Sequence, residues 1–365
     1  MKTAGIMTFL HNENCGSALQ AYALQTALRG LGWTPLGLDY RPSRAEQVRN
    51  LLSSGNSPAV VLDSVLRRRG KGARNTAGFE RFLRERLALS APCPDRPALR
   101  RAAAGCDVLL CGSDQIWSPE WLNPNYFFAF APKDQPRVSY APSLGVAAMP
   151  SPRKMRILQK CVSPFAAVSV REEAGREILR RLLPGREIAV MPDPVFLLTR
   201  ADWLALCGEP ATEPTLVTYF LSDQPAHWAL AEETAAREGL ALRPLAITAQ
   251  ARARAGAIDN PDPLQWLAAM AAASRVVTDS FHGAAFAALL GKPVTVCRRW
   301  RDDDAASKNS RIDQLFALTG WTPGAEGLPS PEVEARLAAE RQRGLDWLAG
   351  ALSSALSADG SGEAR

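Results

Sequence analysis

The sequence predicts an α/β protein built of two parallel-sheet lobes. Short apolar segments alternate with helical patterns along the chain, and this alternation runs twice in succession. Apolar runs between helices are typical of parallel strands that are covered on both faces. The length of 365 residues also fits two domains, at roughly 150 residues a domain. We therefore expect two Rossmann-like lobes, the first over residues 1–163 and the second over residues 164–330.

The elements of the first lobe follow from its apolar pattern. A strand is predicted at 2–9, and a helix follows at 17–31, where leucines repeat at helical spacing and glycines stand at the end. Residues 44–90 interrupt the alternation with turn-rich and helical segments, so we expect a helical excursion there. Further strands are predicted at 35–40, 107–111 and 137–141, and a helix at 152–161.

The second lobe repeats the pattern, and one long helix follows it. A strand at 166–170 precedes a charged helix at 172–183, and the junction between the lobes is expected near 161–166. The last helix is predicted at 331–356, and the small and polar residues 357–365 are expected to be disordered. The remaining strands are predicted at 187–191, 215–221, 240–247, 275–278 and 293–296, with helices at 263–273 and 283–290.

The composition limits the kind of partner. Lys and Arg number 43 against 37 Asp and Glu, which gives a net charge of +6. This mild excess favours anionic small ligands or an anionic membrane surface over a dedicated nucleic-acid binder. The basic run at 67–72 is interpreted as a solvated loop, or alternatively as a landing patch for anionic lipid or glycan.

Cysteine usage and hydropathy indicate a reducing compartment. The seven cysteines are scattered and include no CxxC pair, so neither a disulfide framework nor a zinc ribbon is predicted. The apolar start of the chain meets polar residues at 11–14 without a small-residue cleavage site, so we expect no signal peptide. No run reaches the ~18 apolar residues of a membrane span. We expect a cytoplasmic protein, and contact with the inner face of the membrane stays open.

Residues that follow the first-lobe strands are candidates for ligand binding, because ligands of open parallel sheets bind beyond the carboxyl ends of the strands. Ser17 can cap a helix whose free N–H groups attract an anion or a hydroxyl-rich ligand. Asp114 can bind a hydroxyl pair or accept a proton from an attacking hydroxyl. A plain turn and a helix cap are the alternatives. The candidate saccharide-binding residues are Asn14, Gly16, Ser17, Gln20, Gln115 and Trp117, whose indole is expected to stack on a sugar.

The second set of candidates is cationic. His282 follows the strand at 275–278 and stands at the start of an Ala-rich helix. There it suits a proton donor that becomes charged only when an anionic substrate arrives. Arg171 follows the strand at 166–170, and Arg311 stands where another helix begins; each offers a fork of donors for carboxylate or phosphate. The alternatives are a buried structural histidine and, for Arg171, a surface ion pair.

These segments together resemble the polysaccharide pyruvyl transferase family. The matching motifs keep the family's order over most of the chain up to residue 312. Each motif alone is weak, whereas the ordered set is specific. The motifs are GSALQAYALQ at 16–25, GSDQIW at 112–117, SYAPSLG at 139–145, SVRE at 169–172, PDPVFLL at 192–198, TDSFHG at 278–283 and NSRI at 309–312.

The resemblance implies a fold like that of the GT-B glycosyltransferases, with the active site between the lobes. It implies transfer of the pyruvyl group of phosphoenolpyruvate onto two saccharide hydroxyls as a ketal, with release of phosphate and without a cofactor or a metal. His282 would be the acid and Arg171 an anchor for the donor. The first lobe would be the acceptor side and the second the donor side. A lipid-linked or nucleotide-linked saccharide is the expected acceptor.

One position departs from the family pattern. Several active members carry Arg where this sequence has Ser280, so one cationic contact to a trianionic donor is missing. Either Arg311 or Lys292 supplies that charge, or the donor differs; Ser280 itself stays a candidate donor contact. The alternatives to a pyruvyltransferase are a glycosyltransferase of the same fold that uses a nucleotide sugar, and a non-catalytic glycan-binding relative.

Overall fold

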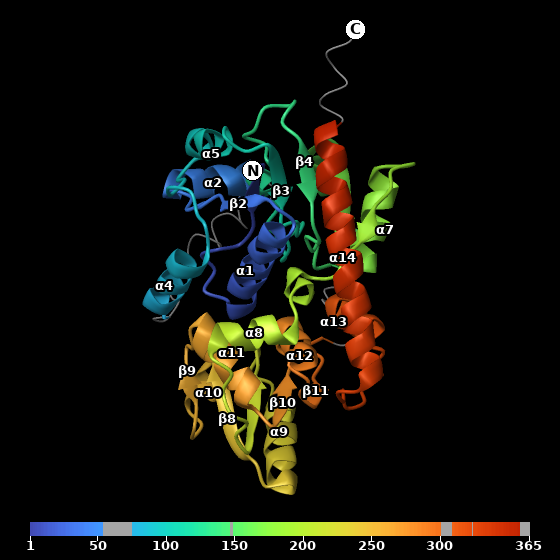
Figure 1. Ribbon diagram of the computed structural model, residues 1–365. Coiled ribbons are helices and arrows are strands. Elements are labelled where there is room, and N and C mark those ends of the chain that lie inside the picture. Colours follow the sequence, from blue (N-terminus) through green and yellow to red (C-terminus); the bar gives the residue numbers. More distant parts are fainter. Residues whose placement is uncertain (54–74, 147–148, 301–308, 323, 358–365) are drawn as a thin grey trace.

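The computed structural model describes residues 1–53, 75–146, 149–300, 309–322 and 324–357. In this part of the chain the strands form two sheets, one of six strands and one of five, and every strand pair is parallel (Figure 1). Helices pack against the sheets. The predicted class of two parallel-sheet lobes is therefore confirmed.

The first sheet has the strand order β2-β1-β3-β4-β5-β6. Met7, Cys111 and Ser139 lie side by side in its ladder, so the segments that follow three strands emerge together at one edge. The strands are β1 (Thr3–Met7), β2 (Thr34–Gly37), β3 (Val108–Cys111), β4 (Arg137–Ser139), β5 (Ala167–Val170) and β6 (Ala189–Val190). The helices around it are α1 (Cys15–Gly30), α2 (Arg44–Ser53), α4 (Thr76–Arg86), α5 (Arg96–Ala103), η2 (Pro124–Phe127), α6 (Pro152–Val162) and α7 (Glu173–Leu182).

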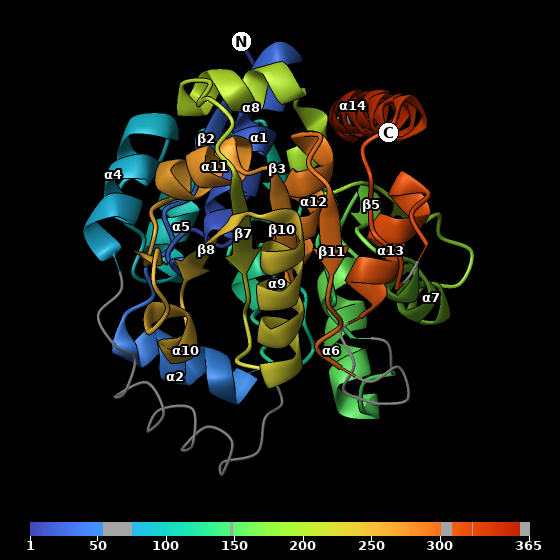
Figure 2. The same cartoon turned by 90° about the horizontal axis from the view of Figure 1, so that it is seen from below.

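The second sheet has the order β11-β10-β7-β8-β9. Its central strands are apolar on both faces: Leu216 packs on one side with Trp228, and Val217 packs on the other side with Trp266. Figure 2 shows α9 in front of these strands and α8 and α11 beyond them. The strands are β7 (Thr215–Tyr219), β8 (Ala241–Ala246), β9 (Ile258–Asp259), β10 (Arg275–Thr278) and β11 (Val294–Val296). The helices are η3 (Pro194–Leu197), α8 (Arg200–Cys207), α9 (Pro225–Glu238), α10 (Ala249–Arg252), α11 (Pro263–Ala272), α12 (Phe281–Leu289) and α13 (Ser310–Thr319).

The predicted junction between the lobes, at 163/164, is wrong. β5 pairs with β4 and β6 pairs with β5, so both strands complete the first sheet. The change of sheet falls between β6 and β7. The apolar pattern showed that these strands exist, but it holds no information on which neighbour each strand pairs with. As a consequence, Arg171 at the end of β5 belongs to the first lobe.

The long helix α14 (Pro331–Ser357) ties the two lobes together. Its first turns pack Val333 and Leu337 into the core beside α12 and α13, and its last turns pack Leu348 and Leu352 on the first sheet. Figure 1 shows this helix running alongside the first lobe and reaching down beside α12 and α13 of the second. The predicted helix at 331–356 is confirmed. The predicted excursion at 44–90 is helical in α2 and α4, whereas residues 54–74, with the basic run at 67–72, and the tail from 358 lie outside the described residues. None of the described helices is long and apolar enough to cross a bilayer.

Candidate active site

The first turns of α1 and α12 meet between the two lobes. Asn14 caps α1 by accepting a hydrogen bond from the backbone N–H of Ser17 at 3.1 Å, and Ser280 caps α12 by accepting from the N–H of Gly283 at 3.4 Å. A Cβ atom placed on Gly16 would stand 2.2 Å from the ring of His282. Glycine is therefore required at position 16 because the imidazole occupies the space of a side chain.

Arg171 is buried and is held on three sides. Its Nη1 donates to Oδ2 of Asp193 at 2.5 Å, its Nε lies 3.9 Å from Oε2 of Glu172, and its guanidinium carbon lies 4.6 Å from the ring centre of Phe281. Burial alone would lower the pKa of this arginine, but Asp193, Glu172 and Asp114 outweigh it and raise the pKa. The predicted alternative of a surface ion pair is therefore wrong, and the side chain is a fixed cation.

Asp193 connects Arg171 of the first lobe to His282 of the second. Its Oδ2 also accepts a hydrogen bond from Ser113 at 2.9 Å and lies 3.7 Å from Nε2 of His282. Burial tends to raise the pKa of this carboxyl, but His282 and Arg171 outweigh burial and hold the pKa well below its usual range. A carboxylate kept ionised in this position orients the guanidinium of Arg171 and lies beside the imidazole of His282.

Two further arginines complete a cationic cluster with Arg171. Burial lowers the pKa of Arg311 to about 10, and repulsion by the charges of Arg171 and Arg299 contributes to this shift. Burial lowers the pKa of Arg299 as well, although Asp279 and Tyr219 act against it. Arg171 is buried and the other two are partly buried, and mutually repelling cations in such surroundings are costly unless an anion neutralises them. We define Arg171, Arg299 and Arg311 as the arginine cluster.

The arginine cluster and His282 carry buried donor atoms that no described residue uses. Each of these atoms lacks a hydrogen-bond partner among the described residues. Buried polar groups in folded proteins are nearly always satisfied, so such a concentration of unused donors indicates the place of a missing ligand. Because the donors are cationic or can become so, the ligand is expected to be an anion. The atoms are Nε and Nη2 of Arg171, Nε of Arg299, Nε of Arg311 and Nε2 of His282.

Asp114 lies on the first-lobe side of the same region. It has a backbone φ of +74°, a conformation that costs energy for a residue with a side chain. One carboxylate oxygen accepts from the hydroxyl of Ser17, and the other accepts from the N–H of Gln115 at 2.7 Å. Asp114 therefore lies at the start of α1, close to Gly16 and His282, where a proton-accepting role stays a prediction.

Three of the predicted saccharide contacts have other structural roles. Trp117 is fully buried and stacks on Phe127 with a centroid distance of 4.9 Å, so its predicted stacking on a sugar is wrong. Gln20 is fully buried and donates to the hydroxyl of Thr8 at 2.8 Å, behind the helix start rather than at it. Gln115 packs against Gly145, where a Cβ would meet its amide nitrogen at 2.1 Å.

Of the predicted donor contacts, Lys292 lies away from the site. Lys292 follows the end of α12 and precedes β11, so it lies at the amino end of the second sheet, whereas His282 begins α12 at the carboxyl end. About ten residues of helix and turn, or roughly 15 Å, separate the two positions. Lys292 therefore cannot supply the charge that Ser280 lacks. Arg311 belongs to the arginine cluster and Ser280 caps α12, and a donor contact of either residue stays a prediction.

Arg299 is the residue that the sequence analysis missed. It follows β11 within the segment 297–300, which has the sequence CRRW. The rule that found Arg171, which considers the residues after each strand, would have found Arg299 as well. The apolar strand before it is only three residues long, and its arginines resemble ordinary surface charges in the sequence.

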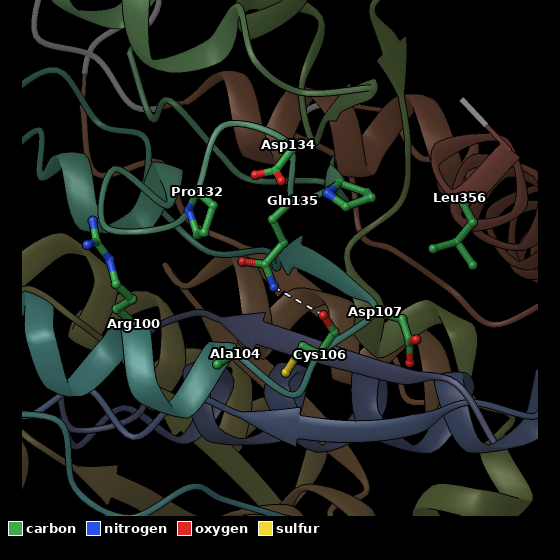
Figure 3. A pocket seen from close by; sticks show the side chains of 9 residues that line it. Arg100, Ala104, Cys106, Asp107, Pro132, Asp134, Gln135 and Leu356 are labelled. Atoms are coloured by element: carbon green, nitrogen blue, oxygen red, sulfur yellow. Dashed lines mark hydrogen bonds between the residues drawn. The ribbon is translucent and has the colours of Figure 1, made fainter. Parts of the chain in front are cut away.

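A separate cavity of about 470 Å³ lies at the opposite edge of the first sheet (Figure 3). It opens beside Asp107 and Gln135, which precede β3 and β4, and the amide of Gln135 donates to the carbonyl of Cys106 at 3.1 Å. This edge holds the amino ends of the strands, where parallel sheets do not place their ligands. Within the described ranges, no three His, Cys, Asp or Glu side chains gather as a metal site would require.

Comparison with solved structures supports the architecture. The chain is similar to AviGT4, a glycosyltransferase involved in avilamycin A biosynthesis, with a TM-score of 0.50, 14% sequence identity and coverage of 98% of each chain. It also matches UDP-GlcNAc 2-epimerase from Neisseria meningitidis (TM-score 0.49, 11% identity, 96% of this chain and 99% of that one). A third match is heptosyltransferase WaaC from E. coli (TM-score 0.42, 12% identity, 87% and 99%). At such identities the likeness concerns the fold, which is of the GT-B type.

No curated protein sequence matches the chain. A family model described as polysaccharide pyruvyl transferase matches residues 14–301, a range that contains the starts of α1 and α12, Asp193 and two members of the arginine cluster. The match covers well over half of the sequence. The chain therefore belongs to the polysaccharide pyruvyl transferase family.

Proposed function

We propose that this protein moves the pyruvyl group of phosphoenolpyruvate onto two hydroxyls of a saccharide and releases phosphate. The observation that carries the proposal is the set of unused buried donors on the arginine cluster and His282. Phosphoenolpyruvate is a compact anion with a carboxylate and a phosphate, and several guanidinium groups beside one proton donor match both its charges and its chemistry.

The arginine cluster is suited to a donor of high charge. Arg171 is oriented by Asp193 and Phe281, which leaves Nε and Nη2 free to form a fork toward an anion. Arg299 and Arg311 come from the second lobe, after β11 and at the start of α13. A trianion between them would replace repulsion among the cations by attraction, and Arg311 would supply the positive charge that is missing at Ser280.

His282 stands where it can protonate the donor. Transfer of a proton from the imidazolium to the methylene carbon of phosphoenolpyruvate converts that carbon to a methyl group and leaves an oxocarbenium-like centre beside the carboxylate. Asp193, 3.7 Å from Nε2, stabilises the imidazolium before the transfer. A first saccharide hydroxyl then adds to the cationic carbon, phosphate leaves with its bonding electrons, and a second hydroxyl closes the ketal. The two hydroxyl protons end on phosphate and on the histidine.

The proposal is tested by measuring phosphate release. Purified protein is incubated with phosphoenolpyruvate and a panel of free and lipid-linked saccharides, and the product is identified by the added mass of pyruvate less one water. Wild type is expected to release phosphate with at least one saccharide. Phosphoenolpyruvate that neither binds nor turns over, together with tight binding of a nucleotide diphosphate, would replace the proposal by a glycosyltransferase of the same fold.

A further inference from the structure

A second cavity lies between the lobes, beside the arginine cluster rather than within it. Its volume is about 200 Å³. The first lobe contributes the loop at 12–15 and the start of α4, and the second contributes the ends of β7 and β8 and the turn before α11. Arg81 and Asp262, joined across the lobes at 2.9 Å, hold α4 and α11 together next to it. Figure 1 shows α1 and α4 facing α11 across this boundary.

The lining of this cavity is polar but almost uncharged. Among the described residues that line it, none is Lys or Arg, and Glu13 is the single acid. Asn12, Asn14, Asn75 and Thr248 supply amides and a hydroxyl, while Phe79 and Tyr219 supply aromatic surface. Among these described lining residues, a phosphate or carboxylate would find no counter-charge. Neutral hydroxyl groups and an apolar ring face match this lining, in contrast to the arginine cluster next to it.

Two of the amide side chains are held rigidly with their donors available. The side-chain oxygen of Asn14 caps α1 through Ser17, and the side-chain oxygen of Asn75 caps α4 through the N–H of Gly78 at 3.0 Å. Capping commits the oxygens, so the NH₂ groups of Asn14 and Asn75 are left as oriented donors. Fixed donors favour binding because little side-chain entropy is lost when a ligand arrives.

Backbone strain also concentrates at this cavity. Glu13 has a φ of 49° and Asn260 a φ of 44°, both in the left-handed region, and the two residues line the cavity from opposite lobes. Such conformations cost about 1–3 kcal/mol each and are found mainly where function requires a particular backbone geometry. The strain is therefore consistent with a binding site that closes when the lobes meet.

The cavity lies next to the proposed reacting centre. Asn14 and Cys15 line it, and Gly16, the next residue, contacts His282. Two peptide units span at most about 8 Å, so a ring bound in the cavity can present a hydroxyl to a donor held at the imidazole. The volume is smaller than the roughly 300 Å³ at which sites for drug-sized ligands begin, which suits a single sugar ring.

We propose that this cavity binds one pyranose ring of the saccharide acceptor, with both lobes contributing to the site. The proposal rests on the pyruvyltransferase function and adds to it the position and the chemistry of the acceptor. It also moves the acceptor away from Gln20 and Trp117, which are buried, and keeps Asn14 among its contacts.

The test blocks the cavity without touching the arginine cluster. Ile247 and Leu221 line the cavity at the ends of β8 and β7, so Ile247→Trp and Leu221→Trp each fill it from the second lobe. The control is Leu230→Trp on α9, where the leucine is 37% exposed and far from the boundary between the lobes. The probes are the methyl glycosides of glucose, galactose and mannose, detected by saturation-transfer NMR, and phosphoenolpyruvate, measured by calorimetry.

The expected result separates the two ligands. At least one glycoside binds wild type and the control, and each blocking variant weakens that binding by at least about tenfold, or ~1.4 kcal/mol. Affinity for phosphoenolpyruvate is retained in every variant, which also shows that the variants fold. Glycoside binding that is unchanged in both blocking variants, or absent from wild type, overturns the proposal. Glycoside binding that responds as expected in a protein that ignores phosphoenolpyruvate supports the sugar site and overturns the pyruvyltransferase function instead.

Discussion

Nε2 of His282 lies 3.7 Å from Oδ2 of Asp193, the same oxygen that accepts the hydrogen bond of Arg171. Arg171 ends a strand of the first sheet, and His282 begins a helix of the second lobe. One buried carboxylate thus couples a cation of each lobe. Because these contacts cross the boundary between the lobes, the proposed acid and the proposed donor anchor are brought together only when the lobes are packed as in this structure.

Removal of the imidazole is expected to abolish most of the turnover. His282→Ala should lower kcat by ~10²- to 10⁴-fold, the usual contribution of a positioned acid, and should change KM for phosphoenolpyruvate much less. Phosphate release at saturating substrate is the measurement. His227→Gln is the control, because this other buried histidine lies on α9 and packs against Phe220. A His282→Ala variant as fast as wild type would remove the proposed acid.

Adding one methyl group to Gly16 is expected to have a similar effect. The new Cβ would stand 2.2 Å from the His282 ring, closer than real contacts allow, so Gly16→Ala must displace the imidazole. We expect a loss of kcat of at least ~10-fold, because misplacing a catalytic group by about 1 Å is costly. The variant is assayed for phosphate release.

A matched control lies on the same helix. A Cβ on Gly30, at the last residue of α1, would meet nothing within 4 Å. Gly30→Ala is therefore expected to keep full activity and to raise stability slightly, by up to ~1 kcal/mol. Equal activity in both variants would mean that the contact between Gly16 and His282 does not matter for turnover.

Arg299 and its neighbour Arg298 form a second matched pair. Arg299→Gln should raise KM for phosphoenolpyruvate by about 10- to 100-fold, since a hydrogen bond to a charged group contributes ~1.5–3 kcal/mol. Arg298 pairs with Asp313 at 2.6 Å with its side chain 27% exposed, so Arg298→Gln should leave KM within about twofold. Affinity is measured by calorimetry as well as from KM. If Arg298→Gln has the larger effect, the arginine cluster is wrongly composed.

The sequence predicted the architecture and the two residues at its centre for an identifiable reason. Ligands of parallel sheets bind beyond the carboxyl ends of the strands, so this rule selected Arg171 after β5 and His282 after β10 separately, although the two strands belong to different sheets. The pairing of the strands, by contrast, could not be predicted from the apolar pattern of the sequence. Assignment of β5 to the first sheet depends on its pairing with β4, which leaves no mark on the apolar run itself.

The wrong site predictions have a common physical origin. Trp117 follows a strand end as a sugar-stacking residue would, but its direction was decided by Phe127 and Phe165, which form its ring contacts from distant parts of the chain. Lys292 is close to His282 in sequence but lies at the other end of α12. Side-chain direction and helix polarity are thus the properties that single motifs do not determine.

Lys292 offers a prediction that contradicts its expected role as a donor contact. Its side chain is buried beside Arg200, and burial together with that neighbouring charge lowers its pKa. Lys292→Met removes an unfavourable buried charge and should stabilise the fold by ~1 kcal/mol without affecting KM for phosphoenolpyruvate. Urea unfolding and steady-state kinetics measure the two effects. A rise in KM of tenfold or more would return Lys292 to the donor site.

Asp193 is expected to make stability depend on pH in acid. Burial raises its pKa, but His282 and Arg171 outweigh burial and lower the pKa below the unfolded value of roughly 3.9. Its stabilising contribution is therefore present above about pH 4 and is lost as the pH falls through the lower folded pKa. Asp193→Asn removes one partner of a buried pair and should cost ~3–5 kcal/mol at pH 7.

The difference between wild type and Asp193→Asn should then narrow below about pH 4, because the carboxyl of the unfolded wild-type chain takes up a proton there while the folded carboxyl stays ionised. Urea unfolding at pH 7, 5 and 3.5 gives the comparison. Asp313→Asn is the control, since Asp313 belongs to an exposed ion pair with Arg298 and should contribute less than ~1 kcal/mol at any pH. A gap that stays constant down to pH 3.5 would mean that the folded carboxyl is not held ionised. Asp193 would then connect Arg171 and His282 by packing rather than by its charge.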